Sequence, residues 1–189
     1  MNILPSLIAL LLALASGVIQ AKEAANKQDV VIADLPLDIA VKQVRGDGRR
    51  LLVIFEDPNC IYCKRLDMDL ADLTDVTIYS FVYPVLSGDS MNKAKAVWCS
   101  VDRKKAWSQL MLKGIAPAPA RCDAGAIDKV VALGKKLGVR ATPTIFLANG
   151  ERISGAASSM VIEMAISSPR VLSFQVEQER TRSASASQP

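Results

Sequence analysis

The 189-residue sequence contains no histidine. A c-type haem attachment motif needs histidine directly after its second cysteine, so that class is excluded. A zinc site needs four ligands, and two of the four cysteines are not closely paired with any other, which argues against zinc. The chain also lacks any block of like charges: its net charge of +4 is spread along the sequence. We therefore expect no metal, no cofactor and no nucleic-acid partner.

Charge is also absent from the first 21 residues. The apolar segment from Ile3 to Ala15 is short for a membrane span, which needs about 20 apolar residues. It is typical of a secretory signal, and we predict cleavage after Ala21, with an uncleaved anchor as the alternative. Either outcome places the cysteines outside the cytoplasm, where disulfides persist. After cleavage no stable membrane insertion is expected.

Two cysteines, Cys60 and Cys63, stand at the predicted start of a helix. The apolar run 51–55 predicts a buried strand, residues 57–59 (Asp-Pro-Asn) break it, and helical spacing then continues to about Leu73. A helix N-terminus stabilises an anion, and a thiolate placed there becomes the reactive species. The pair therefore predicts dithiol–disulfide exchange, with a plain structural disulfide as the alternative.

The rest of the chain predicts alternating strands and helices. Strands are expected at 76–85 and 139–147, and Asn149-Gly150 predicts a hairpin turn into a return strand at 151–154. Further helices are expected at 35–44, 91–113, 126–137 and 158–167. This order of elements predicts an α/β protein with a thioredoxin fold and a helical insertion.

Two further pairs of residues fit that fold. In thioredoxin folds a cis proline faces the redox pair, and its loop pairs with a bound extended chain. We therefore predict a cis bond between Thr142 and Pro143. Cys99 and Cys122 flank the helical insertion, and neither lies at a strand-to-helix turn. They predict a structural disulfide, with a second redox centre as the alternative.

Four stretches in this order resemble the catalytic domain of the DsbC/DsbG family of bacterial periplasmic disulfide isomerases. They are FEDPNCIYCKRL (55–66), AVWC (96–99), APA with CD (116–118 and 122–123), and LGVRATPT (137–144). Together they span about residues 35–166. The resemblance implies a periplasmic thiol:disulfide interchange protein that acts as an isomerase or reductase on misoxidised secreted or envelope proteins.

The resemblance also implies roles for individual residues. Cys60 would be the exposed nucleophile and Cys63 the resolving thiol. Thr142, Pro143 and Tyr62 would face the substrate. The pair Cys99 and Cys122 would be the permanent disulfide. A DsbD-type membrane electron donor would keep the dithiol reduced.

Two departures from the family pattern affect these expectations. Ile61 stands where the family often has glycine. Only about 30 residues separate the signal from the catalytic strand, which is too few for the family's N-terminal dimerisation domain, so we expect a monomer or weak dimer. The predicted organisation is a signal (1–21), an N-terminal tail (22–34), a thioredoxin-like domain (35–168) and a disordered tail (169–189).

Other function classes stay open at this point. The chain could be a non-catalytic thioredoxin-fold binding module or a dedicated accessory of a conjugation or secretion complex. A metal chaperone using both thiols is a third possibility, which the lack of histidine argues against.

Overall fold

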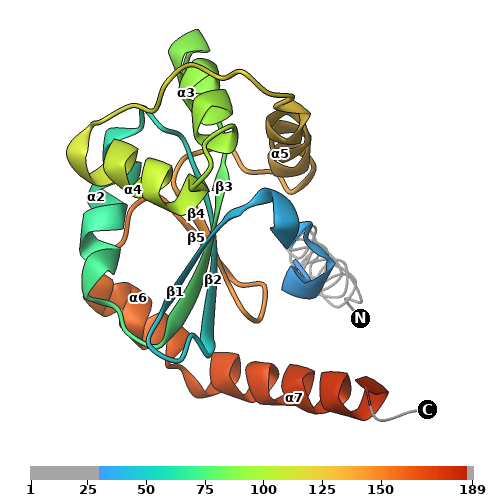
Figure 1. The fold of residues 1–189 in the computed structure, drawn as a ribbon. Coiled ribbons are helices and arrows are strands. Elements are labelled where there is room, and N and C mark those ends of the chain that lie inside the picture. The colour runs from blue at the N-terminus through green and yellow to red at the C-terminus, as the bar shows by residue number, and fades with distance from the viewer. Residues whose placement is uncertain (1–29, 187–189) are drawn as a thin grey trace, which may run out of the picture.

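A mixed five-stranded sheet forms the centre of the protein (Figure 1). The computed structural model describes residues 30–186, so the predicted signal and residues 22–29 of the predicted tail lie outside the described residues. The strand order is β1-β3-β2-β4-β5, in which only β2 and β3 run parallel. The strands are β1 (Val41–Arg45), β2 (Arg50–Glu56), β3 (Val76–Val82), β4 (Thr144–Leu147) and β5 (Arg152–Ser154).

Helices cover both faces of this sheet, because the central strands are apolar on both sides. Helix α2 (Ile61–Asp69), the short η3 (Leu70–Asp72) and α6 (Ser159–Ile166) pack on one face over Leu52, Ile54 and Ile78. Helix α5 (Gly125–Lys136) packs on the other face over Val53 and Phe55. Alternate residues of β2 therefore point into opposite cores.

The helical insertion is broken into two helices. One continuous helix over 91–113 was expected, but the structure has α3 (Gly88–Trp98) and α4 (Arg103–Lys113). The second helix begins after Asp102, whose carboxylate accepts a hydrogen bond from Lys105 N at 2.9 Å and caps the N-terminus of α4. The two helices enclose a third apolar cluster that includes Trp107 and both Cys60 and Cys63. The insertion thus covers the dithiol from one side.

The predicted helix at 35–44 is wrong. Residues 32–39 form two short 3-10 helices, η1 (Ile32–Asp34) and η2 (Leu37–Ile39), and the chain then enters β1. Strand β1 pairs antiparallel with β3, with Val41 opposite Ser80. Val41 and Val44 are β-branched and suit a strand. The spacing of apolar residues along the chain does not show that the edge of β3 is free to pair with them. Ile32 is buried, so the domain begins before residue 35.

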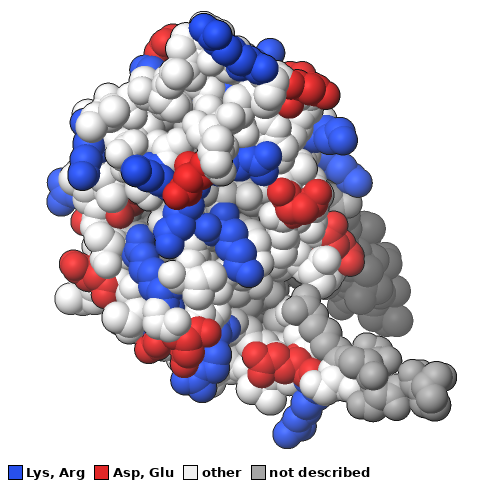
Figure 2. Space-filling model, viewed as in Figure 1, with Lys and Arg blue, Asp and Glu red and all other residues white. Residues whose placement is uncertain are grey.

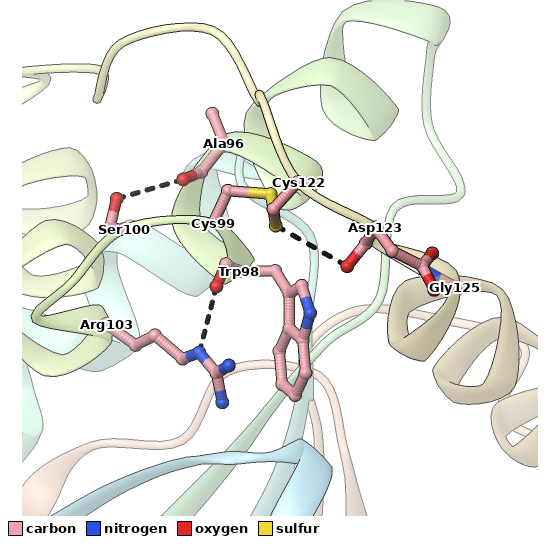
Figure 3. Close-up of a disulfide and its surroundings, with 8 residues drawn as sticks. All are labelled: Ala96, Trp98, Cys99, Ser100, Arg103, Cys122, Asp123 and Gly125. Atoms are coloured by element: carbon pink, nitrogen blue, oxygen red, sulfur yellow. Dashed lines mark hydrogen bonds between the residues drawn. A yellow bond between two sulfur atoms is a disulfide. The ribbon is translucent and has the colours of Figure 1, made fainter.

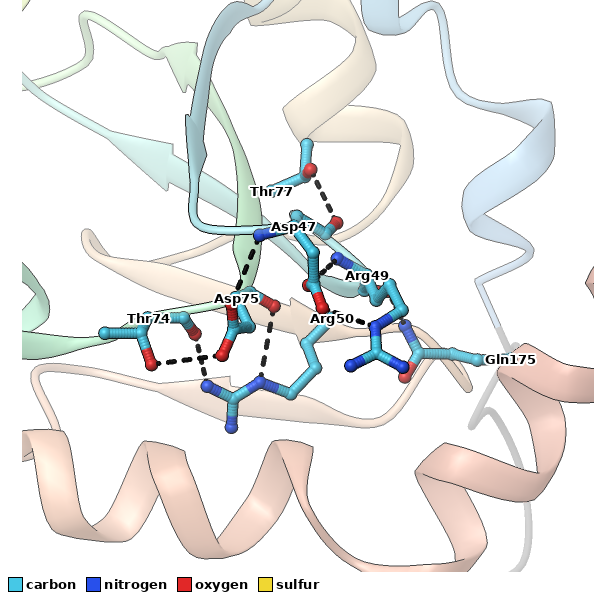
Figure 4. A network of polar contacts seen from close by, with 8 residues as sticks. Asp47, Arg49, Arg50, Thr74, Asp75, Thr77 and Gln175 are labelled. Atoms are coloured by element: carbon cyan, nitrogen blue, oxygen red, sulfur yellow. Dashed lines mark hydrogen bonds and ion pairs between the residues drawn. The ribbon is translucent and has the colours of Figure 1, made fainter.

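The predicted disorder of residues 169–189 is wrong for 169–186, which form helix α7 (Pro169–Ala186) along the lower edge of Figure 1. Val171 is buried in the core that α2 and α6 share. Further along, Gln175 Nε2 donates to Arg49 O at 3.0 Å (Figure 4). The polar composition misled the prediction because the buried Val171, the Arg170–Glu151 ion pair and the Gln175 contact anchor the helix.

Charges of both signs are interspersed over the face shown in Figure 2. No helix among residues 30–186 is long and apolar enough to cross a membrane. Several Lys and Arg side chains gather near the middle of the face in Figure 2.

Candidate active site

The two cysteines of the CxxC motif lie at the N-terminus of α2 as free thiols. Strand β2 ends at Glu56, and the turn that follows brings Cys60 to the N-cap position of the helix. Cys63 N donates a hydrogen bond to Cys60 Sγ at 3.3 Å. The sulfur of Cys60 therefore occupies the place where a helix N-terminus stabilises negative charge.

The loop before β4 reaches the same sulfur from the other side. The Thr142–Pro143 bond is cis, as predicted. The Cys60 thiol donates to Thr142 O at 3.3 Å, although 82 residues separate them in the chain. Pro143 is buried, and its carbonyl accepts from Gly155 N at 2.8 Å, which ties the loop to β5. The dithiol and the cis-proline loop thus form one site.

The expected exposure of Cys60 is not found: Cys60 is 5% exposed and Cys63 is completely buried. The side chains between them face solvent instead, with Ile61 73% and Tyr62 66% exposed. An i, i+3 spacing on a helix turns both cysteines toward the insertion and the sheet, and turns the intervening residues outward. Ile61 and Tyr62 therefore present an aliphatic and an aromatic side chain to solvent beside the dithiol.

Two carboxyl groups lie buried between α2 and the sheet. Glu56 points to the α2 face of the sheet because it follows Leu52 and Ile54 in the alternation of β2. Its Oε1 accepts from Ser80 Oγ at 2.8 Å, and Oε2 is buried without a hydrogen-bond partner. Asp67 lies one helical turn after Cys63 on the buried face of α2. Both acids were missed in the sequence.

Burial is the largest cause of the pKa shifts of Glu56, Asp67 and Cys63. It raises the pKa of Glu56 well above its usual range, and the charge of Asp67 raises it further. Burial also raises the pKa of Asp67 to about 7, opposed by the positive charge of Arg45. The pKa of Cys63 is raised strongly, first by burial and then by Glu56. Cys63 therefore stays a neutral thiol in the resting site.

The sequence does contain signals for these acids. Glu56 extends an otherwise apolar strand directly before the CxxC turn, and Asp67 falls at i+4 from Cys63, where helical periodicity predicts a buried position. Their mutual proximity had no sequence signal, because it depends on how α2 lies across the sheet.

The second pair of cysteines forms the predicted disulfide. Cys99 and Cys122 are joined across a sequence separation of 23 (Figure 3). Cys99 ends α3, and Cys122 lies in the irregular segment before α5. Beside them the Arg103 guanidinium stacks on Trp98 at 3.4 Å. The bridge ties the segment after the insertion back onto α3.

Metal ligands do not gather anywhere in the described part of the chain: residues 30–186 contain no group of three or more histidine, cysteine or acidic side chains able to hold an ion.

Comparison with known proteins agrees with the geometry. A thioredoxin-like domain family matches residues 37–167. The fold and the paired thiols at a helix N-terminus are those of a thioredoxin-type protein, and the chain belongs to the thioredoxin-like family. It is similar to proteins named thiol:disulfide interchange protein DsbC.

Three relatives illustrate the match. The "Probable thiol:disulfide interchange protein DsbC" of Bordetella pertussis is 50% identical over 127 residues, which cover 67% of this chain and 45% of that protein. The DsbC of Escherichia coli K12 is 35% identical over 111 residues, covering 57% and 46%. A solved disulfide interchange protein from Neisseria gonorrhoeae has 39% identity and a TM-score of 0.66, covering 70% of this chain and 96% of that one. The chain spans less than half the length of these DsbC relatives.

Proposed function

We propose that this protein is a periplasmic thiol:disulfide oxidoreductase that reduces or isomerises wrong disulfides in secreted or envelope proteins. One observation carries the proposal: Cys60 Sγ lies 3.3 Å from both Cys63 N and Thr142 O, at a helix N-terminus and beside a cis proline. A thiol in that position is ready to attack a disulfide, and an extended substrate can pair with the adjacent backbone.

The chemistry follows from the two thiols. The Cys60 thiolate attacks one sulfur of a substrate disulfide, a mixed disulfide forms, and the other substrate sulfur leaves as a thiolate. A substrate thiol can then displace Cys60, which leaves the protein reduced and the substrate isomerised. Alternatively Cys63 loses its proton and attacks, which forms the Cys60–Cys63 disulfide and releases the substrate with two electrons gained.

The neutral state of Cys63 supports this division of roles. A buried thiol that holds its proton does not compete with Cys60 for the substrate disulfide. Tyr62, which is largely exposed beside Cys60, and the loop of Thr142 and Pro143 form the proposed substrate-facing surface. A DsbD-type membrane donor would return two electrons to the oxidised pair, and we propose that the protein works as a monomer or weak dimer.

A non-catalytic binding module is the second candidate, and the low exposure of Cys60 favours it. A redox site needs an accessible sulfur, whereas a docking module does not. The reactivity of Cys60 separates the two.

The test uses the mature chain in a glutathione buffer, with insulin reduction and reactivation of scrambled ribonuclease as measurements. We expect Cys60→Ser to fall to the rate of buffer alone, because the attacking sulfur is gone. Cys63→Ser should accumulate mixed disulfides on a non-reducing gel, because Cys60 then has no resolving partner. Full activity of Cys60→Ser would contradict the proposal, and an inert wild-type pair would favour the binding module.

A further inference from the structure

A buried carboxylate organises the turn that leads into the dithiol. Asp57 is completely buried, and each of its oxygens accepts two hydrogen bonds. Oδ1 accepts from Asn59 N and from Ser90 Oγ, both at 2.8 Å. Oδ2 accepts from Val85 N at 2.8 Å and Leu86 N at 2.9 Å. One side chain thus joins the active-site turn, the segment after β3 and the start of α3.

Asn59 makes a second set of contacts to the same helix. Its Nδ2 donates to Asp89 Oδ2 at 2.8 Å and to the hydroxyls of Ser87 and Ser90. Its Oδ1 accepts from Lys93 Nζ at 2.7 Å. Asn59 is only half-buried, so this set forms the outer part of the network. Both side chains of the turn are therefore fixed to α3 rather than to α2, the helix that carries the cysteines.

The backbone of the turn passes this restraint to Cys60. Cys60 N donates to Asp57 O at 3.0 Å, and Cys60 is the next residue after Asn59. The sulfur contacts Cys63 N of α2 and Thr142 O of the opposite loop. These two groups belong to different elements, so both distances hold only if the turn is held in place. A loose turn would let the sulfur move away from the Cys63 N–H.

We propose that Asp57 and Asn59 are positioning residues that hold Cys60 Sγ against the Cys63 N–H, so that α3 of the insertion sets the reactivity of the dithiol. The inference deepens the proposed function and rests on it. The N–H contact stabilises the thiolate and hence the reduced form of the pair. Weakening the contact favours the disulfide form.

Charge alone predicts the opposite result for Asp57. A carboxylate near the site opposes a thiolate, so removing it without moving the turn would stabilise the reduced form. Asn59 carries no charge, so a pure charge effect leaves an Asn59 variant unchanged. Comparing the Asp57 variant with the Asn59 variant therefore distinguishes a positioning effect from a charge effect.

The experiment measures the equilibrium constant for oxidation of the Cys60–Cys63 dithiol by glutathione disulfide at pH 7, in the full chain. We expect Asp57→Asn and Asn59→Ala each to raise this constant roughly fivefold, about the effect of losing one hydrogen bond. The rate of Cys60 alkylation by iodoacetamide should fall by a similar factor. Asp57→Asn loses acceptor capacity where backbone N–H groups point, and Asn59→Ala removes the contacts of a half-buried, uncharged side chain with α3.

The matched control is Asp47→Asn. Like Asp57, Asp47 accepts a hydrogen bond from the backbone N–H two residues later: Arg49 N donates to Asp47 Oδ1 at 3.0 Å (Figure 4). This turn lies before β2, at the opposite end of the strand from the dithiol. The Asp47→Asn variant should leave the equilibrium constant for oxidation of the dithiol unchanged.

A fall in the constant for Asp57→Asn with no change for Asn59→Ala would mean that Asp57 acts by charge, and would overturn the inference. Lower melting temperatures with unchanged constants would mean a structural role only, and would also overturn it. A wild-type chain that does not exchange with glutathione would overturn the proposed function itself, and the inference with it.

Discussion

At the scale of single residues, the site places two acids where apolar side chains would be expected. Glu56 ends β2, and Asp67 lies on the buried face of α2, the helix that carries Cys63. Burial disfavours their charged forms, and two carboxyl groups close together cannot both ionise easily. At neutral pH this part of the core therefore holds protons that the unfolded chain would release. The consequence is a pH dependence of stability with a defined sign.

The unfolded chain releases the Asp67 proton near its usual pKa of 3.8, whereas the folded chain holds it up to a pKa of about 7. Between these values the folded state binds more protons, so the free energy of unfolding falls as pH rises through this window. We expect Asp67→Asn to flatten the decline and to be more stable than wild type at pH 7.5 by on the order of 2 kcal/mol.

Urea unfolding at pH 5 and pH 7.5 checks this expectation. Asp69→Asn on the same helix is the control, because Asp69 is paired with Arg65 at the surface. If the free energy of unfolding changed with pH equally in wild type and in Asp67→Asn, the raised pKa of Asp67 would be contradicted.

At the scale of elements, the insertion and the sheet edge decide the geometry of the site. Helix α3 anchors the active-site turn, and α4 packs Trp107 into the cluster that contains both cysteines. Close packing also fixes α5 against the end of β3: a Cβ added at Gly134 of α5 would meet the Tyr83 ring at 2.5 Å. The Cys99–Cys122 bridge then fixes the end of α3 to the segment that leads into α5.

The bridge predicts a stability effect that is separable from the redox site. Closing a loop across a sequence separation of 23 restricts the unfolded chain. The double variant Cys99→Ala with Cys122→Ala should therefore lower the free energy of unfolding by about 3 kcal/mol. Disulfide exchange at Cys60 should persist at temperatures where the variant is folded. Loss of exchange in a variant of unchanged stability would show that this pair takes part in the chemistry.

At the scale of the whole molecule, α7 extends the domain beyond the matched family segment of residues 37–167. Arg50 connects the sheet to α6, the helix before α7, since its guanidinium pairs with Glu163. Val171 adds a buried apolar side chain to the same core as Ile162. The end of the domain is therefore part of its core rather than an independent tail.

The substitution Val171→Ala tests this attachment. Val171 is 1% exposed, so losing two methyl groups and leaving a cavity should lower the free energy of unfolding by about 2 kcal/mol. Val176→Ala is the matched control on the same helix, 48% exposed, and should change stability by less than about 0.5 kcal/mol. Equal, small effects from both variants in chemical denaturation would mean that α7 does not pack on the domain in solution.

The sequence by itself determined the parts of this protein that depend on local order. The apolar run of β2, the turn, and the helical spacing after Cys60 are neighbours in the chain, so periodicity and turn residues predicted strand, turn and CxxC helix correctly. The Thr142–Pro143 step and the pairing of Cys99 with Cys122 followed from their places in the predicted element order.

Tertiary structure decided what depends on distant partners. Residues 41–45 became a strand because the edge of β3 was free, and residues 169–186 became a helix that the core anchors through Val171. The network of Asp57 and Asn59 spans segments some 30 residues apart, and Glu56 and Asp67 meet only because α2 crosses β2. Hydrogen bonds and charge interactions of this kind act through space, and local spacing along a chain does not encode which surfaces will meet.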